Sequence, residues 1–206
     1  MATGDTKLSI CSDALIILGA SPLSSFEEGT DAAQICDRLY DDLRDLLLVS
    51  YPWSFTLRKV QLARLVDAPA SEWNYAYALP ADILSSGPRA LFNSATAGAR
   101  QVTEGWEVYE GNVLTNLTEV HIDYQFQPTE AVMPRYFVQL LKYHTAWHIA
   151  EPVTDQISKA EYWQSVAVGA PSENMRGGYF RQAMNIDGQT SPPQQLQNFE
   201  IIDVRH

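Results

Sequence analysis

Apolar positions in the first fifty residues recur every three or four places. Between Thr6 and Leu18 they fall on one face of a helix, and Gly19 follows where a left-handed C-cap is expected. A second run of this spacing extends from Thr30, a suitable N-cap, to about Ser50. The pattern predicts two amphipathic helices that pack as an antiparallel hairpin.

The spacing changes after Pro52 and stays closer to two until about Pro128. The clearest strand covers 119–126, where apolar and polar residues alternate without a break, so one face should be buried. Residues 102–108 predict a partner strand, and Gly111-Asn112 suits a tight hairpin turn. Two weaker strand candidates are residues 74–78 and 89–92.

Helical spacing returns in the third part of the chain. Pro134 suits a first helical turn, and the helix should stop near Ala150 because Pro152 follows. Thr154 or Asp155 would then cap a fourth helix. A continuation or a fifth helix is expected around 172–184.

These elements predict an α+β fold with a β-rich insertion. We expect residues 1–52 and 129–185 to form an antiparallel bundle of four to five helices, and residues 53–128 to form an inserted antiparallel β module. Residues 186–206 are expected to form an extended C-terminal arm, because 188–198 carry no charge and contain two adjacent prolines.

The end of the arm is apolar and β-prone. Such a segment either folds back on its own domain or reaches another subunit or partner, for instance by adding a strand to a sheet edge, and we favour the second. The candidate docking residues are Phe199, Ile201, Ile202 and Val204.

Charge narrows the possible partners. The 206 residues carry a formal net charge of −11, so the chain has no net attraction to nucleic acid or anionic lipid. Cys11 and Cys36 fall on apolar helix faces, which favours a reduced compartment over a disulfide framework. We expect no signal peptide, and no apolar run is long enough for a membrane span.

The strongest enzymatic candidate is a pair of histidines. His144 and His148 share a helix face at a spacing that can bind a metal, with Glu151 nearby, which would suit a small metal-dependent hydrolase. The metalloprotease pattern needs Glu directly after the first His, where this chain has Thr145. We therefore favour two histidines packed and hydrogen-bonded at a helix–sheet seam. We expect no enzymatic activity and no cofactor.

An ordered series of short motifs points elsewhere. It runs from the segment 14–22 through Ala32 to Tyr40, then Leu46-Leu47 and Tyr51-Pro52-Trp53-Ser54-Phe55, and on to the segments 62–63, 73–77 and 79–82. This series resembles the bacteriophage tail tubular protein A family, the head-to-tail adaptors of short-tailed and related phages. The resemblance is strongest across residues 8–84 and fades after about Met184.

The resemblance implies a structural protein of the virion. Such adaptors form a ring, commonly a dodecamer, that joins the portal to the tail nozzle or tube, and DNA passes through the channel. An extended C-terminal arm reaches into the portal in related adaptors. Another tail-completion role is the alternative within the same class. Five aromatic residues would form a seam within the fold or between subunits: Trp53, Phe55, Trp73, Tyr75 and Tyr77.

Overall fold

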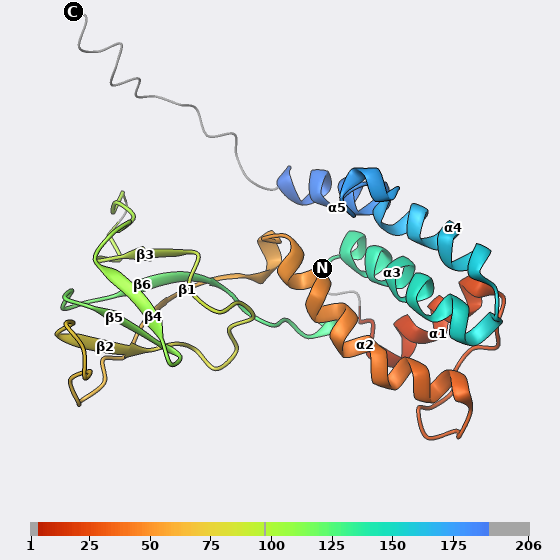
Figure 1. Ribbon diagram of the computed structural model, residues 1–206, viewed down its shortest axis with the longest axis horizontal. Helices are drawn as coiled ribbons and strands as arrows, with labels where there is room; N and C mark the ends of the chain where they lie inside the picture. Colours follow the sequence, from red (N-terminus) through yellow and green to blue (C-terminus); the bar gives the residue numbers. More distant parts are fainter. Residues whose placement is uncertain (1–3, 97, 190–206) are drawn as a thin grey trace, which may run out of the picture.

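The computed structural model describes residues 4–96 and 98–189. The architecture is α+β, as predicted: five α-helices form one body, and two three-stranded antiparallel sheets form a β module beside it. Figure 1 shows the two parts side by side along the long axis of the molecule. The predicted start of the C-terminal arm is wrong, because residues 186–188 belong to the last helix, Gly178–Gly188. Residues 190–206 of the expected arm, with the candidate docking residues, lie outside the described residues.

The first two helices begin and end where the sequence predicts. Helix α1 spans Lys7–Leu18, and the Thr6 side chain accepts a hydrogen bond from the Ser9 amide. Gly19 ends α1 in the left-handed conformation, with φ of 79°. Helix α2 spans Asp31–Ser50, and the Thr30 side chain accepts from the amide of Ala33.

Helix α3, Arg135–Thr154, corrects one prediction, because it continues through Pro152. A proline removes one amide and so one hydrogen bond, to the carbonyl four residues before it. In the last turn this loss is tolerated, and the Thr154 hydroxyl donates to the carbonyl of Ala150 at 2.6 Å. Asp155, with φ of 53°, ends α3 instead of capping the next helix, whose N-cap is Gln156.

The last two helices complete the body around α3. Helix α4 spans Ile157–Val168 and α5 spans Gly178–Gly188. The other four helices all pack against α3, whose inner face includes the fully buried Phe137, Leu140 and Leu141. Three short 3₁₀ helices also occur, η1 Ser54–Thr56, η2 Glu130–Val132 and η3 Pro171–Glu173.

Six short strands form the β module. All pairings are antiparallel, in the orders β1-β6-β3 and β2-β5-β4. The strands are β1 Leu57–Gln61, β2 Tyr75–Ala78, β3 Ala90–Phe92, β4 Trp106–Tyr109, β5 Asn112–Thr115 and β6 His121–Gln125.

The alternation around β6 is confirmed over Val120, Ile122 and Tyr124, which are buried. It fails at its end, where Gln125 is buried and Phe126 is only half-buried. The predicted partner is wrong: β4 pairs with β5 in the other sheet. The hairpin turn between them is Glu110-Gly111, with φ of 48° and 74°, which fits a two-residue turn with two positive φ values. β6 pairs instead with β3 and with β1, a strand that the sequence pattern did not reveal.

The β module returns to the helical body at a buried polar contact. Gln125, at the end of β6, donates through Nε2 to the carbonyls of Leu48 (3.2 Å) and Tyr51 (3.1 Å) and to the hydroxyl of Thr56 (3.1 Å). Leu48 lies in the last turn of α2, where carbonyls lack partners within the helix. The sheet thus supplies the hydrogen bonds that end α2. Among the described residues, no helix has the length and hydropathy of a transmembrane span.

Candidate interaction surfaces

The predicted aromatic seam divides between the two parts. Trp53 is fully buried in the helical core, where its indole donates to the carbonyl of Leu47 at 2.9 Å. Its ring lies edge-on to Phe137 and Phe180, with centroids 5.1 and 5.7 Å apart. The half-buried Phe55 packs on the same group of rings. Trp53 therefore anchors one chain internally and offers no surface to a second chain.

The other three aromatic residues belong to the β module. Tyr77 is buried in its core and donates its hydroxyl to the carbonyl of Leu117 at 2.7 Å. Tyr75 is half-buried against the same core. Trp73 is half-buried, and its indole donates to Glu107 at 2.8 Å. A subunit contact remains a proposal for Trp73 and Tyr75, which keep exposed surface.

The histidine pair lies between helices and not at a helix–sheet seam, which corrects the expected location. His144 and His148 border an apolar cavity of about 360 Å³, together with Leu46 and Leu47 of α2 and Met175 and Phe180 near α5. The rings of the two histidines are 4.4 Å apart between centroids. His148 Nδ1 makes a 2.9 Å hydrogen bond with the carbonyl of His144.

Burial makes the two imidazoles weak bases. It lowers the pKa of His144 to about 3, with a smaller contribution from His148, and it also lowers the pKa of His148. Nδ1 of His144 is buried and has no hydrogen-bond partner in the described part of the chain. Glu151 is exposed, and residues 4–96 and 98–189 hold no group of three or more metal-ligating side chains. The proposed third ligand is therefore not brought to the pair.

A buried carboxylate links α5 to the entrance of the β module. Asp187 accepts hydrogen bonds from the Ser54 amide at 2.9 Å, from the Ser54 hydroxyl at 2.7 Å and from the hydroxyl of Tyr136. This contact raises the pKa of Tyr136, after the larger effect of burial. Sequence reasoning did not find Asp187. The one sequence feature that could have indicated its role is an acidic residue at a helical position beside apolar neighbours. An acidic side chain is rarely buried at such a position unless it is paired.

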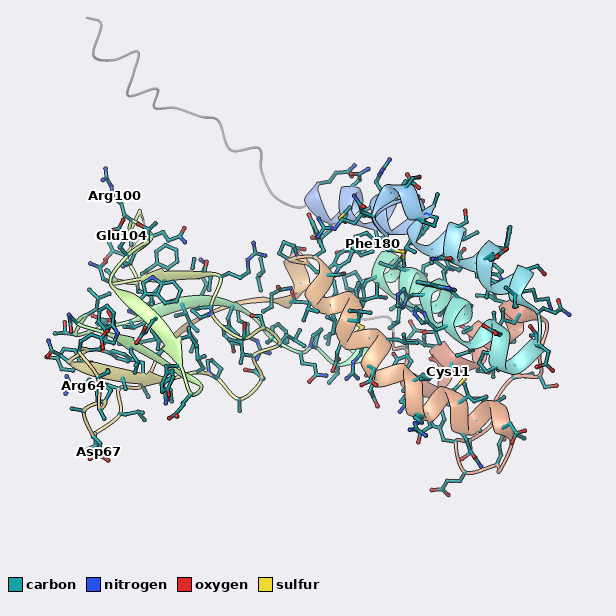
Figure 2. All side chains as sticks on the ribbon, viewed as in Figure 1. Cys11, Arg64, Asp67, Arg100, Glu104 and Phe180 are labelled. Carbon is teal, nitrogen blue, oxygen red and sulfur yellow. The ribbon has the colours of Figure 1, made fainter. Side chains whose placement is uncertain are left out.

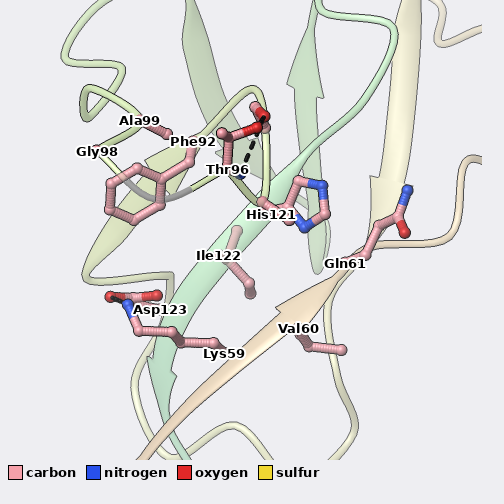
Figure 3. Close-up of a pocket in the computed structure, with 12 residues that line it drawn as sticks. Lys59, Val60, Gln61, Phe92, Thr96, Gly98, Ala99, His121, Ile122 and Asp123 are labelled. Atoms are coloured by element: carbon pink, nitrogen blue, oxygen red, sulfur yellow. Dashed lines mark hydrogen bonds and ion pairs between the residues drawn. The ribbon is translucent and has the colours of Figure 1, made fainter.

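The outer face of the first sheet carries a hollow of about 470 Å³ (Figure 3). Its floor includes Lys59 of β1, His121 and Asp123 of β6, and Phe92 of β3. Lys59 pairs with Asp123 at 2.5 Å and lies 5.5 Å from the centroid of the Phe92 ring. The hollow therefore combines a paired carboxylate with a lysine side chain that is 79% exposed.

Exposed apolar side chains occur at both ends of the long axis. At the far end of the β module, Leu65, Val66 and Tyr109 are exposed, near the labelled Arg64 and Asp67 in Figure 2. At the other end, α4 begins just after the turn that follows α3 (Figure 1), and its first residue, Ile157, is exposed; Tyr162, further along α4, is exposed as well. Clustered exposed apolar residues are typical of interaction surfaces.

No protein-family model matches the chain, and no curated protein matches it. Among solved structures, the chain is similar to a chain of the "Neck of empty GTA particle computed with C6 symmetry". The two are 15% identical, the alignment covers 79% of this chain and 94% of that chain, and the TM-score is 0.28.

Proposed function

We propose that this chain is a structural head-to-tail adaptor of a phage-like particle. Copies of the chain form a ring around a channel for DNA, and the ring joins the portal to the tail nozzle or tube. The ordered motifs between residues 14 and 82 support this proposal through their resemblance to tail tubular protein A. The ring has twelve copies, as is common among the adaptors that the sequence resembles.

The observation that carries the proposal is that apolar side chains are exposed at opposite ends of the molecule. Leu65, Val66 and Tyr109 are exposed at one end, and Ile157, the first residue of α4, is exposed at the other. A chain that joins two larger assemblies needs two separate contact surfaces held apart by a rigid body. The buried contacts of Gln125 and Asp187 hold the two parts together.

The proposal also assigns roles to residues outside the apolar surfaces. Phe199, Ile201, Ile202 and Val204 dock on another chain of the assembled particle, which the resemblance identifies as the portal. The excess of carboxylates, reflected in the net charge of −11, lines the channel in part and repels DNA phosphates during passage. Assembly takes place in the host cytoplasm, and the mature protein is part of the virion.

The test is complementation of particles made without this chain. We expect DNA-filled heads and separate tails in its absence, and joined particles when the wild-type chain is supplied. The double variant Leu65→Glu/Val66→Glu should fold, by circular dichroism, but fail to join tails. The matched control Thr118→Glu, at an exposed polar position of the same module, should restore joining. Firmly joined heads and tails in particles that lack the chain would overturn the proposal.

A further inference from the structure

Strand β1 has one open edge. It lies at the end of its sheet, paired only with β6. The hydrogen bonds from the Phe126 amide to the Thr56 carbonyl and from the Leu62 amide to the Val120 carbonyl show that even-numbered residues face β6. The main-chain groups of Lys59 and Gln61 therefore point away from it. Across the described residues, no other strand pairs with them.

The neighbouring strand leaves a gap in register with this edge. Beyond β1 the chain turns toward β2. The Leu65 amide donates to the carbonyl of Ala76, and the Ala78 amide donates to the carbonyl of Ala63. β2 ends at Ala78, and Pro80 follows soon after. The position beside Lys59 and Gln61, in line with β2, is therefore left for a further antiparallel strand.

The side chains of β1 are incompletely covered on both faces. Leu57 on one face is 44% exposed, and Val60 on the other is 37% exposed. Lys59 pairs with Asp123, yet its side chain is 79% exposed and remains accessible to a second carboxylate. A strand that fits this edge would present apolar residues on both faces and an acidic residue opposite Lys59.

One segment of this chain meets that description. Residues 199–204 read Phe-Glu-Ile-Ile-Asp-Val, with two apolar residues and one acidic residue on each face of a strand. In the antiparallel register that places Ile202 opposite Leu57, Glu200 lies opposite Lys59 and Phe199 opposite Val60. Each exposed apolar residue then gains an apolar partner, and the lysine gains an acidic one.

The place where α5 ends brings this segment within reach. Asp187 is hydrogen-bonded to Ser54, three residues before β1 begins, so the chain leaves the helical body near the start of that strand. Figure 1 shows α5 ending on the side of the body that is nearest the β module. Nine residues, 190–198, extend up to about 30 Å. Val60 lies at most about 20 Å along the chain from Ser54, which leaves length for a turn.

We propose that, in the free protein, residues 199–204 add an antiparallel strand to the open edge of β1 in the same chain. The contact covers an edge that otherwise invites pairing between copies. It goes beyond the adaptor function and does not depend on it. If the proposed function holds, the segment leaves β1 when a partner chain in the particle binds it.

The test is a disulfide between the paired positions in the full chain. In the proposed register Val60 and Phe199 form a non-hydrogen-bonded pair, whose Cα separation of about 4.5 Å suits a disulfide. Val60→Cys/Phe199→Cys, oxidised with glutathione disulfide, should give an intramolecular bond, identified by peptide mass. The control Val60→Cys/Glu200→Cys places the second thiol on the opposite face of the strand. It should form at least about tenfold less of the intramolecular disulfide. The native Cys11 and Cys36 are buried.

A disulfide that joins two chains would overturn the proposal and assign the edge to a second copy. Equal bonding of the two variants would overturn it as well. Hydrogen exchange gives a second measurement without new cysteines: the amide of Lys59, which lies opposite Glu200 in this register, should exchange at least about tenfold faster when the chain is truncated after Gln197. Unchanged exchange at Lys59 would mean that the segment docks elsewhere, and this outcome leaves the adaptor function standing.

Discussion

Asp187 and Ser54 are 133 positions apart, yet both carboxylate oxygens of Asp187 accept hydrogen bonds from the main chain or hydroxyl of Ser54. Ser54 begins the short helix η1 that leads into the β module, so its amide lacks a helical partner. The last helix therefore satisfies a donor at the entrance of the inserted module. Because Asp187 is buried, the contact is protected from competition by water.

Asp187→Asn should lower the free energy of unfolding by about 2 kcal/mol, since it removes hydrogen bonds to a buried charge. Urea denaturation monitored by tryptophan fluorescence measures the change. Asp67→Asn, at an exposed loop position, is the matched control and should change stability by less than about 0.5 kcal/mol. Equal stability of the two variants would contradict the assigned role.

Gln125→Leu should destabilise the protein by about 2 kcal/mol, because it removes a buried hydrogen-bond donor from the carbonyls of Leu48 and Tyr51 and leaves only the Trp53 amide to donate to Tyr51. The comparison variant is Gln127→Leu. Gln127 also uses its amide, donating to Asp45 at 2.9 Å, but the contact is exposed and should contribute little. A larger loss for Gln127→Leu than for Gln125→Leu would show that the end of α2 does not depend on β6.

Acid should destabilise the protein through His144. The pKa of His144 is about 3 in the folded protein and near 6.5 when unfolded, so the unfolded state binds more protons between these values. Stability contributed by the neutral imidazole is complete above about pH 6.5 and falls as pH decreases toward 3. The slope approaches about 1.4 kcal/mol per pH unit.

The measurement is urea denaturation of the wild type and of His144→Gln at several values between pH 7 and pH 4. The difference in unfolding free energy between the two proteins should change with pH in the predicted direction, with the variant less sensitive to acid. If the unfolding free energies of the two proteins fall in parallel with pH, protonation of His144 does not destabilise the folded state. This result would contradict the lowering of the His144 pKa by burial.

Gly178, at the start of α5, should not tolerate alanine. Its φ is 49°, and an added Cβ would approach the carbonyl oxygen of Val166 to 2.6 Å. Gly178→Ala should therefore cost about 2 kcal/mol or more. Gly188→Ala, at the other end of α5, meets nothing within 4 Å and should be neutral or stabilise by up to about 1 kcal/mol. Thermal unfolding of both variants distinguishes these outcomes.

The helices were predictable because their signals are local. The predicted caps Gly19 and Thr30 act within one turn of the chain, and the structure places them as the sequence indicates. The end of α3 was predicted too early because the destabilisation caused by a proline depends on its position in the helix. In the last turn, where Pro152 lies, the loss of one hydrogen bond costs little.

Strand pairing was less predictable because it depends on distant residues. The sequence pattern of β4 fits pairing with any amphipathic strand, so the pattern alone does not identify its partner. The turn at Glu110-Gly111 is what pairs β4 with β5. β1 has no buried face, so no alternation marks it. The roles of Gln125 and Asp187 arise from contacts with residues at least 51 positions away, and the sequence near either residue does not identify those partners.

The β module enters and leaves the helical body at neighbouring points. Leu57 at the start of β1 is the register partner of Gln125 at the end of β6, so the two crossings are adjacent strands. A turn of a few residues could therefore replace the β module between these two positions without moving the helices. It follows that the module can change in length or be exchanged for another between related chains, while the five helices keep their packing.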